Sequence, residues 1–593
     1  MYSYIMNKCM DYKKTKPEDF EHTRAIAEFR GKLFEGDWPT LPEMFRISAA
    51  RYPERNCFTV FEPDRITLTY AEALKKIETL AQWMAEAGVK KGDRVAVTGK
   101  NSPEWAVVYL AAGFAGAVIV PIDNGLHEPE AENLLKASGA KLIFVDEEKY
   151  DYFTGKADEL GITVRALNKK HPETYVYNLE PAGTYKQTVE NTPSGDDLCA
   201  ILFTSGTTGN PKGVMLSHSN LVIDCYMIQS HMYIYSTDVF YALLPIHHAY
   251  TMLAVFIESC SVGAELVFGK SMAVSKMLKE LKEGKITMLL GVPLLFNKLL
   301  AGIMKGIKAK GPVVYGFMRF LMGFSYIMKK VTGHNPGKKM FKAVLDKASL
   351  GSLRIAICGG GPLAPSIFKI YNEMGIDFVQ GYGLTETAPV LALNPVYHFK
   401  IDSVGKYFPD WMDMRIADPD ENGVGEVQVI GPSVMQGYYN MPEETDAVFT
   451  EDGWFKTGDL GRMDSEGYLY LAGRAKNLIV TEGGKNVFPE EIENAFQLVD
   501  DIEQITVQGY IINEETKSEA VEALVYASDA AYSRLGVTRG TPEGDEAVRA
   551  TIQEAVDKVN KTEQPYARIT RLTMLEKPLE MTTTKKVKRT YNK

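Results

Sequence analysis

The chain has 593 residues, of which 45% are hydrophobic and 24% are charged, and its net charge is −10. At about 150 residues per domain it could hold roughly four compact units around a large core. This composition excludes an intrinsically disordered chain and gives no sign of a nucleic-acid partner. The cysteines lie far apart, without disulfide or metal-ligand spacing, so we expect a reducing compartment. They are Cys9, Cys57, Cys199, Cys225, Cys260 and Cys358.

The N-terminal residues 1–19 include lysines but no apolar core followed by a small-residue cleavage site. We therefore expect no secretory signal and a cytoplasmic location. The longest apolar stretch, Trp105 to Val120, is interrupted by Gly113 and Gly116, and it is shorter than the roughly 20 residues that a membrane-spanning helix needs. It predicts a buried helix followed by a strand that ends at Pro121.

Apolar runs of strand length alternate with helical patterns through most of the chain, which predicts an α/β fold. In the unit from Leu353 to Glu386, a strand leads into Gly359–Gly361, a helix follows, and Asp377–Gln380 returns as a second strand. A right-handed crossover makes two such strands parallel, so the loops at their carboxyl ends open on one edge of the sheet. We expect Gly360 and the loop Tyr382–Glu386 to face one crevice. Other strand-like runs are Arg94–Thr98, Lys141–Val145 and Cys199–Phe203.

Short strands and turns replace this pattern after Gly423, which predicts a small antiparallel β region. A separate α+β pattern begins at Lys476, with Pro489 at a helix start. We therefore predict an N-terminal domain, residues 1–475, of layered α/β subdomains plus the small β region. A C-terminal α+β domain, residues 476–593, follows.

The loop Thr204–Gly213 follows an apolar strand and combines hydroxyls, glycines and a lysine. Glycine lets backbone N–H groups approach phosphate oxygens closely, so the loop predicts a phosphate cradle. It is not a Walker loop, because Asn210 and Pro211 intervene where that motif needs its lysine. A polar hairpin turn is the alternative. The candidate phosphate-binding residues are Thr204, Ser205, Gly206, Thr207, Thr208, Gly209 and Lys212.

Glu386 lies in Gln380–Thr387, a loop that also supplies glycines, an aromatic ring and hydroxyls. Mg²⁺ takes oxygen ligands and is usually held by one or two protein groups plus substrate phosphates. Glu386 and the Thr204 hydroxyl suit that role. The alternative for a lone glutamate is a solvated surface charge.

Five ordered motifs together resemble those of the acyl-adenylate-forming superfamily, which includes acyl-CoA synthetases, luciferases and peptide-synthetase adenylation domains. The resemblance covers the chain from about Leu41 to Arg589. Within it, Leu244–His248 and Thr481–Glu490 most resemble the long-chain fatty acid CoA ligases. The five motifs are Thr204–Gly213, Gln380–Thr387, Thr457–Asp459, Gly473–Arg474 and Thr584–Arg589.

The resemblance implies a two-step reaction with ATP, Mg²⁺ and coenzyme A. A fatty acid carboxylate attacks the α-phosphate of ATP and releases pyrophosphate, and a thiol then opens the acyl-adenylate. One alternative is a ligase that loads an acyl carrier protein or stops at the adenylate. Another is a non-catalytic nucleotide-binding protein that kept the fold.

The resemblance also assigns roles to residues around the nucleotide. Thr385 would touch a phosphate, and Asp459 with Arg474 would hold the ribose. His248 would flank the acyl group, although a core histidine is the alternative. The residues that would frame adenine are Gly360, Gln380, Gly381 and Tyr382.

The C-terminal domain would supply the remaining groups. Lys586 begins a Lys–aliphatic–any–Arg pattern that the superfamily uses for its catalytic lysine, and Lys585 beside it leaves open which ammonium enters the site. Such a cation can stabilise charge that develops in the transition state, whereas a solvated basic tail is the alternative. Lys476 would be the hinge about which this domain turns, and Gly483 and Gly484 would line the approach of coenzyme A.

The segment Lys298–Lys347 is rich in lysine and has one acid, Asp346, beside an aromatic and Met-rich stretch from Val313 to Met328. A cationic, apolar surface of this kind could lie on the inner face of an anionic membrane as a peripheral contact. A pair of helices packed beside the acyl tunnel is the alternative.

Overall fold

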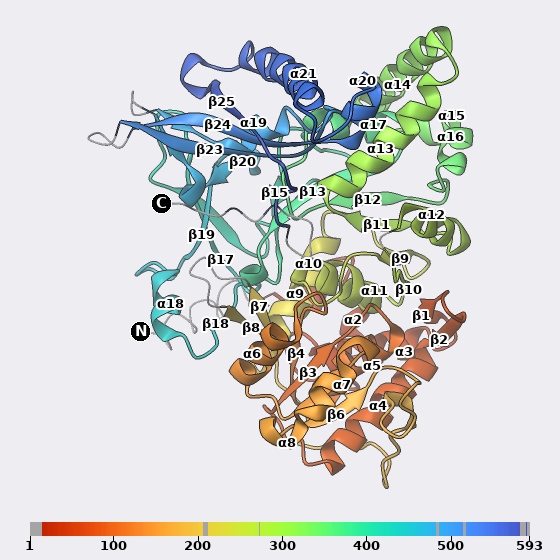
Figure 1. Cartoon of the computed structure of the whole chain (residues 1–593). Helices are drawn as coiled ribbons and strands as arrows, with labels where there is room; N and C mark the ends of the chain where they lie inside the picture. The colour runs from red at the N-terminus through yellow and green to blue at the C-terminus, as the bar shows by residue number, and fades with distance from the viewer. Residues whose placement is uncertain are drawn as a thin grey trace.

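The structure is a computed structural model that describes residues 15–204, 211–271, 273–481, 485–513, 518–581, 587 and 589. Two large sheets form the body of the molecule, with helices between them and on their outer faces, and a smaller unit follows at the C-terminal end (Figure 1). The predicted α/β class is confirmed.

The first large sheet has seven strands in the order β18-β8-β7-β4-β3-β5-β6. Its strands from β7 to β6 are parallel, whereas β8 runs antiparallel to β7 and places Lys212 opposite Thr204. Val95 and Ala96 of β3 are both fully buried, in different core clusters, because both faces of this parallel sheet are covered by helices. The strands are β3 (Arg94–Thr98), β4 (Val118–Pro121), β5 (Leu142–Val145), β6 (Thr163–Ala166), β7 (Leu198–Thr204), β8 (Lys212–Ser217) and β18 (Gly437–Tyr438).

The second sheet has 13 strands, and its polarity changes at β13. On one side β13 pairs in parallel with β12, which confirms the predicted strand–helix–strand unit, and on the other it pairs antiparallel with β14. The strands are β1 (Asn56–Val60), β2 (Ile66–Thr69), β9 (Val239–Ala242), β10 (Glu265–Phe268), β11 (Met288–Gly291), β12 (Ile355–Cys358), β13 (Asp377–Gly383), β14 (Val390–Leu393), β15 (Gly405–Tyr407), β16 (Asp413–Ala417), β17 (Gly425–Ile430), β19 (Phe455–Met463) and β20 (Tyr468–Arg474).

The small β region expected after Gly423 is therefore part of this second sheet. Its strands β17, β19 and β20 are antiparallel as predicted. They join the larger ladder through β15 and β14, because the free edge of β13 offers backbone groups that must be paired.

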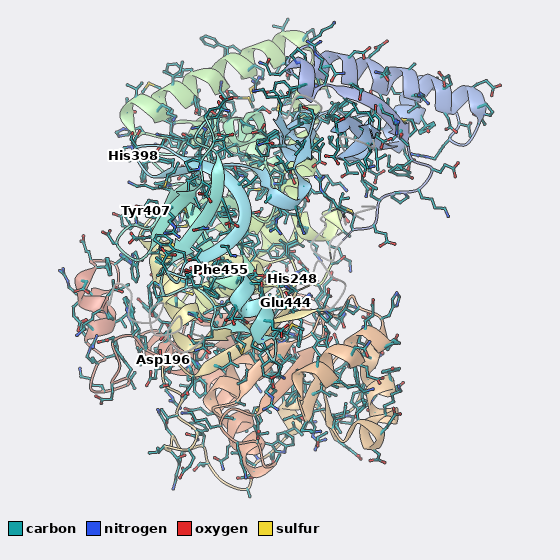
Figure 2. All side chains as sticks on the ribbon, turned by 90° about the vertical axis from the view of Figure 1, so that its left-hand side faces the viewer. Asp196, His248, His398, Tyr407, Glu444 and Phe455 are labelled. Atoms are coloured by element: carbon teal, nitrogen blue, oxygen red, sulfur yellow. The ribbon has the colours of Figure 1, made fainter. Side chains whose placement is uncertain are left out.

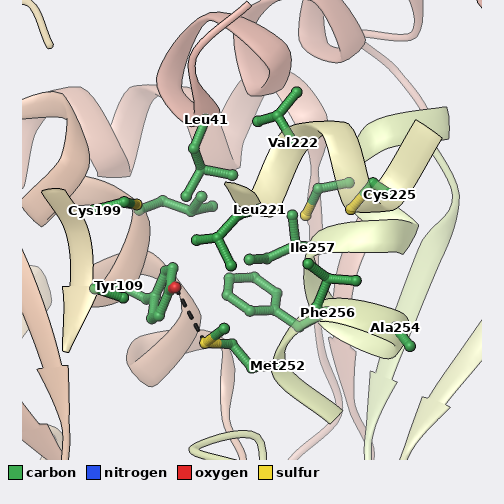
Figure 3. Packing of buried hydrophobic residues seen from close by; sticks show 14 of the residues in the cluster. Leu41, Tyr109, Cys199, Leu221, Val222, Cys225, Met252, Ala254, Phe256 and Ile257 are labelled. Atoms are coloured by element: carbon green, nitrogen blue, oxygen red, sulfur yellow. Dashed lines mark hydrogen bonds between the residues drawn. The ribbon is translucent and has the colours of Figure 1, made fainter. Parts of the chain in front are cut away.

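The layer of helices between the sheets carries the main core. Helix α5 (Pro103–Phe114) begins with proline after Ser102, whose hydroxyl accepts a hydrogen bond from the Trp105 N–H at 3.2 Å, and every one of its residues is buried. A helix that is apolar all round needs cover on all sides. Figure 3 shows part of this packing, where the Tyr109 hydroxyl donates to Met252 Sδ at 3.2 Å. The layer contains α3 (Leu41–Arg51), α4 (Tyr70–Glu86), α5, α9 (His218–Gln229), α10 (Ala249–Thr251), the π-helical η3 (Met252–Ile257) and α11 (Glu258–Val262).

Further helices cover the outer faces of the two sheets. α6 (Glu128–Ser138), α7 (Glu147–Gly155) and α8 (Ala157–Leu160) cover the first sheet. The helices on the second sheet are α12 (Val274–Glu283), α13 (Pro293–Lys308), α14 (Pro312–Thr332), α15 (Gly337–Met340), α16 (Lys342–Lys347) and α17 (Pro365–Glu373). The short η1 (Pro17–Asp19), α2 (Arg24–Ala27), η2 (Val176–Asn178) and α18 (Pro442–Ala447) lie in connections.

The C-terminal unit has its own core, built on a three-stranded sheet and a two-stranded ribbon. The chain enters it through η5 (Ala475–Asn477), where Lys476 lies. Its elements are β21 (Ile479–Val480), β22 (Asn486–Val487), α19 (Pro489–Asn494), β23 (Ile502–Asn513), β24 (Ser518–Ala527), α20 (Asp529–Leu535), α21 (Pro542–Asn560), η6 (Pro565–Ala567) and β25 (Ile569–Met574).

Two general properties bear on the site. The cysteines in the described part of the chain are all buried and unpaired, and these are Cys57, Cys199, Cys225, Cys260 and Cys358. Among the helices of the described ranges, none is both long and apolar enough to cross a bilayer.

Candidate functional site

A cavity of about 1560 Å³ opens where the carboxyl ends of strands from both large sheets meet the C-terminal unit. Thr204 at the end of β7 lies in its wall, as do Gly360 after β12 and the segment Gly381–Glu386. The Gly360 loop and the Tyr382–Glu386 loop thus face one crevice, as the parallel strands predicted.

Two glycines in this wall are required by the backbone. Gly360 has φ of +76°, a left-handed conformation that glycine adopts without strain. At Gly383 a Cβ atom would lie 1.8 Å from the Pro389 carbonyl oxygen, so no side chain fits. Both positions keep the loop close to the space where a ligand would lie.

A tyrosine, an aspartate and an arginine form a linked set beside the cavity. The Tyr382 hydroxyl donates to Asp459 Oδ2 at 2.7 Å, and Arg474 Nε lies 2.9 Å from Asp459 Oδ1. Asp459 and Arg474 are brought together because they are paired residues of β19 and β20. Burial and then the Asp459 charge raise the pKa of Tyr382, so this hydroxyl remains a donor. Tyr382 and Arg474 line the cavity, whereas Asp459 is buried behind them.

Glu386 and Lys212 are each held by a neighbour from the segment around α18. The Tyr438 hydroxyl donates to Glu386 Oε1 at 2.9 Å. Lys212 forms an ion pair with Glu444, and its ammonium lies 4.9 Å from the centre of the Tyr438 ring. Burial and the Glu386 charge raise the pKa of Tyr438. Glu386 and Lys212 therefore face the cavity in fixed positions.

His248 lines the cavity at the N-terminal end of α10. Beside it lie two residues that the sequence interpretation missed, His247 and Asp123. Asp123 Oδ1 is 3.2 Å from His247 Nε2, and the two imidazole rings are 4.2 Å apart. The first histidine of the Leu244–His248 motif and the aspartate that follows β4 were the available signals, since both stand near strand ends.

The oxygen atoms of Thr204 and Glu386 fit a hard cation such as Mg²⁺, because both residues line the same cavity and both offer oxygen. Asp123, His247 and His248 also have potential ligand atoms within 4.8 Å of one another. Two imidazoles and one carboxylate suit a transition metal better than Mg²⁺. The donor chemistry therefore favours the predicted pair for Mg²⁺.

Another part of the wall is apolar and leads to a buried carboxyl group. Thr251, Ala254 and Glu258 recur at helical spacing through α10, η3 and α11, and all three line the cavity. Glu258 is 1% exposed, and its Oε1 accepts from Gln229 at 2.8 Å. Apolar residues of the wall include Ile228, Phe240, Met288, Leu290, Val390 and Leu393.

Burial raises the pKa of Glu258 to about 8. Its Oε2 has no hydrogen-bond partner within the described ranges, although the thiol of Cys225, a weak donor, lies against the carboxyl group. This neutral acid inside an apolar wall was not predicted from the sequence, where it has no motif.

The C-terminal unit contributes to the cavity wall. Lys476, Glu580 and Met581 line it, and burial followed by the Arg474 charge lowers the pKa of Lys476. Met581 pairs with Val587, and Arg589 donates to the Glu493 carboxylate at 2.6 and 2.8 Å. The tail is thus attached to its own domain on one side and reaches the cavity on the other.

The structure describes two of the remaining predicted residues, Thr385 and Gln380. Thr385 lines the cavity, whereas Gln380 is buried in β13 and lies outside the wall. The others fall outside the described residues, and these are Ser205, Gly206, Thr207, Thr208, Gly209, Gly483, Gly484, Lys585 and Lys586.

Figure 2 labels His248, Glu444 and Phe455, which come from three separate elements around the cavity. Phe455 of β19 lines it together with His248. The site is therefore assembled from the middle helical layer, the antiparallel part of the second sheet and the connection around α18.

Several known proteins are similar to this chain over most of its length. A feruloyl-CoA synthase of Amycolatopsis sp is 31% identical over 471 residues, which cover 78% of this chain and 84% of the relative. A long-chain-fatty-acid–CoA ligase of Mycobacterium bovis is 30% identical over 559 residues, covering 88% and 90%. The crystal structure of ATP-bound MatB from Rhodopseudomonas palustris has a TM-score of 0.72 and 25% identity, covering 93% of this chain and 97% of that one.

A protein family described as AMP-binding enzyme matches residues 45–439. This match spans well over half of the chain and contains the loop at Thr204, the histidine motif and the Glu386 loop. The chain belongs to the AMP-binding enzyme family.

Proposed function

We propose that the protein is an ATP-dependent acyl-CoA synthetase that activates a medium- or long-chain fatty acid. The observation that carries this proposal is a single cavity with two kinds of wall. One part offers the hydroxyls, carboxylate and cations of the family motifs, and another is apolar and suits a hydrocarbon chain. The fatty acid ligase of M. bovis, similar over 88% of this chain, favours the same substrate class.

In the proposed first step, a carboxylate oxygen of the acid attacks the α-phosphorus of ATP. The bond to the bridging oxygen breaks, and pyrophosphate leaves with its electron pair. Asp459 and Arg474 hold the ribose, Tyr382 with the backbone of Gly360 and Gly381 frames adenine, and Gln380 supports this wall from β13. Thr385, Lys212 and residues 204–209 bind the phosphates.

Mg²⁺ supplies positive charge that neutralises the phosphate oxygens when it is bound. Thr204 and Glu386 hold it in this proposal, and the hydrogen bond from Tyr438 to Glu386 fixes the carboxylate that does so. Lys586 brings a further cation to the α-phosphate. Its neighbour Val587 is bridged to Met581 in the cavity wall, which supports that role.

In the second step the thiol sulfur of coenzyme A attacks the acyl carbon, the thiol proton is lost, and AMP leaves. His248 flanks the acyl group, and Gly483 and Gly484 line the approach of the thiol. Between the two steps, residues 476–593 rotate about Lys476. A few residues at the start of a domain can absorb such a rotation. A reducing, cytoplasmic location is part of the proposal, and the unpaired cysteines favour it.

The test is mass spectrometry of the products formed from ATP, coenzyme A and a mixed panel of aliphatic and aromatic acids. We expect acyl-CoA, AMP and pyrophosphate with aliphatic acids. Acyl-adenylate that accumulates despite coenzyme A, and disappears when an acyl carrier protein is added, would instead identify a carrier-loading ligase. If no acid in the panel leads to pyrophosphate release, the protein would instead be a nucleotide-binding protein without catalytic activity.

A second candidate substrate is an aromatic acid with a polar distal group. It is favoured by Glu258, a neutral and incompletely hydrogen-bonded carboxyl group in the apolar wall. Such a group can both donate to and accept from a hydroxyl. The feruloyl-CoA synthase of Amycolatopsis, with 31% identity, points the same way.

Paired acids that differ by one hydroxyl distinguish the two candidates. If Glu258 forms a hydrogen bond with a distal hydroxyl, kcat/KM for the hydroxylated acid should exceed that for its partner by about 10-fold or more. The partner would leave the buried carboxyl group of Glu258 without that hydrogen bond, which is costly. The preference should vanish in Glu258→Leu and persist in part in Glu258→Gln. A wild-type preference for the plain hydrocarbon chain would exclude the aromatic candidate.

A further inference from the structure

Helix α14 carries an apolar stripe on its outer side. The stripe consists of Val313, Phe317, Phe320, Phe324, Ile327 and Val331, which alternate at spacings of four and three residues, and their exposed fractions range from 48% to 83%. Residues at this spacing share one face of a helix. Over 18 residues at about 1.5 Å each, the stripe is roughly 27 Å long.

This exposure is concentrated on α14. Within the described ranges, the phenylalanines that are largely exposed are Phe317, Phe320 and Phe324, so all of them lie on this helix. Figure 1 shows α14 at the periphery of the molecule, beside α13. A continuous exposed apolar surface of this size marks an interaction site.

The opposite face of α14 is firmly attached to the protein. Met322, Ser325 and Lys329 are buried there, and the Lys329 ammonium lies 2.7 Å from both Asp377 Oδ1 and the Asn372 side-chain oxygen. The helix also packs against α13 and α17. The stripe therefore cannot turn inward without breaking a buried ion pair.

Positive charge surrounds the stripe at both ends. Between Lys298 and Lys347 the sequence has one acid, Asp346, and that carboxylate pairs with Lys342 at 2.8 Å. The exposed lysines are Lys298, Lys305, Lys308 and Lys310 before the stripe, and Lys330, Lys339, Lys342 and Lys347 near or after its end. The chain as a whole has a net charge of −10, so this basic region is a local feature.

We propose that the α14 stripe lies in the surface of an anionic phospholipid membrane. Aromatic and aliphatic side chains on one helix face, flanked by lysines, are suited to the boundary between headgroups and acyl chains. The lysines would attract anionic headgroups while their aliphatic stems extend toward the polar layer. The inner face stays on the protein, so the helix lies on the membrane and does not cross it.

A second copy of the chain is the competing occupant, and charge disfavours it. Pairing two stripes face to face would bring two lysine-rich regions together with almost no acid between them. Like charges in such a contact repel, whereas an anionic bilayer is complementary to them.

The alternative expected a pair of helices packed beside the acyl tunnel. Residues 298–347 do form packed helices, but the cavity wall contains no described residue from this segment. The hydrocarbon surface of the stripe is thus separate from the hydrocarbon wall of the site, and removing it leaves the cavity intact.

Vesicle flotation of the full-length protein tests the proposal. The wild type is compared with Phe317→Ser/Phe320→Ser/Phe324→Ser on vesicles of phosphatidylcholine alone and of phosphatidylcholine with 30 mol% phosphatidylglycerol, a fraction on the order of the anionic content of cellular leaflets. We expect the wild type to float with the anionic vesicles and the triple variant to bind about 100-fold more weakly.

Two further variants separate the causes. Val189→Ser/Leu498→Ser/Tyr566→Ser removes three side chains that are 44–90% exposed elsewhere, and it should float like the wild type. Lys305→Gln/Lys308→Gln/Lys310→Gln should weaken binding to the anionic vesicles about 10-fold or more and leave binding to phosphatidylcholine unchanged. Adenylation of a short, water-soluble acid should stay at the wild-type rate in every variant.

Three outcomes would overturn the proposal. The first is wild-type protein that stays in solution with both kinds of vesicle. The second is equal flotation of the wild type and the phenylalanine variant. The third is a wild-type dimer by sedimentation that the phenylalanine variant converts to a monomer without any vesicle binding, which would make the stripe a contact between copies.

Discussion

Asp459 links two residues of the cavity wall, since it accepts from Tyr382 and pairs with Arg474. Because both hydrogen bonds to it are assisted by its charge, replacing the carboxylate by an amide should weaken both. We expect Asp459→Asn to raise the KM for ATP about 10-fold or more. Pyrophosphate release at varied ATP measures the effect.

Asp464 provides a matched control for that change. It accepts from Lys400 at 2.7 Å and from the Tyr470 hydroxyl at 3.0 Å, a similar cation and tyrosine, but neither of these partners lines the cavity, whereas Tyr382 and Arg474 do. Asp464→Asn should lower the midpoint of thermal unfolding and leave the KM for ATP unchanged. A similar rise in KM for both variants would show that Asp459 acts through general stability.

Glu258 should make stability depend on pH. Its folded pKa is about 8, above the ordinary value of 4.5, so between these values the folded state keeps a proton that the unfolded state loses. Its contribution is complete below pH 4.5 and is lost as the pH rises toward 8. The free energy of unfolding of the wild type relative to Glu258→Gln should therefore fall by on the order of 3 kcal/mol from pH 5 to pH 8.

Urea unfolding at several pH values measures this difference. Glu159→Gln, at an exposed position of α8, should follow the wild type throughout. A difference between the wild type and Glu258→Gln that stays constant with pH would mean that the carboxyl group does not titrate in this window.

At the level of residues, the sequence was most informative where chemistry sits at the ends of strands. Gly360, Tyr382 and Glu386 could be grouped because the crossover rule brings the carboxyl ends of neighbouring parallel strands to one edge. Glu258 could not, because it reaches the cavity through packing between distant elements that no local pattern encodes.

The connection η5 joins the body to the C-terminal unit through Lys476, which also lines the cavity. A proline there fixes φ and removes backbone freedom that a rotation needs. We expect Lys476→Pro to retain adenylation, since the tail already reaches the cavity, and to slow thioester formation about 10-fold or more. Pyrophosphate exchange and transfer from supplied acyl-adenylate measure the two half-reactions.

Lys476→Ala is the matched control, because it removes the same ammonium without restricting the backbone. It should slow thioester formation far less than the proline variant does. Wild-type rates for both half-reactions in Lys476→Pro would place the hinge elsewhere.

Among elements, those defined by local periodicity were predicted well. The unit β12–α17–β13 follows from strand-length and helical patterns with glycines between them. The joining of β17, β19 and β20 to the same sheet was missed, because edge pairing depends on strands far apart in the chain. For α14 the sequence left open whether its apolar residues form an outer surface or a packed helix pair, since helical spacing alone does not tell which side is covered.

The whole molecule brings a tail from its last domain to a cavity in its first. Lys586→Ala should slow adenylation about 100-fold or more, because it removes a cation from the developing charge, and should spare transfer from supplied acyl-adenylate. The same two half-reaction assays apply. Lys585→Ala is the control and should keep adenylation. Equal loss of both half-reactions in Lys586→Ala would contradict a specific role of Lys586 in adenylation.

At this scale the α/β class and the order of the motifs were readable from the sequence, and the fold agrees with them. The meeting of the C-terminal unit with the cavity was suggested through the family resemblance. In the structure, Glu580 and Met581 of the C-terminal unit line the cavity.

The buried cysteines have a chemical consequence for an enzyme of this kind. An acyl-adenylate is an electrophile that would modify any accessible sulfhydryl of the protein that makes it. The cavity wall contains no cysteine among its described residues, and burial raises the pKa of Cys199, Cys225 and Cys358. The thiols in the described part of the chain are thereby kept away from the activated intermediate, which is preserved for an acceptor arriving from outside.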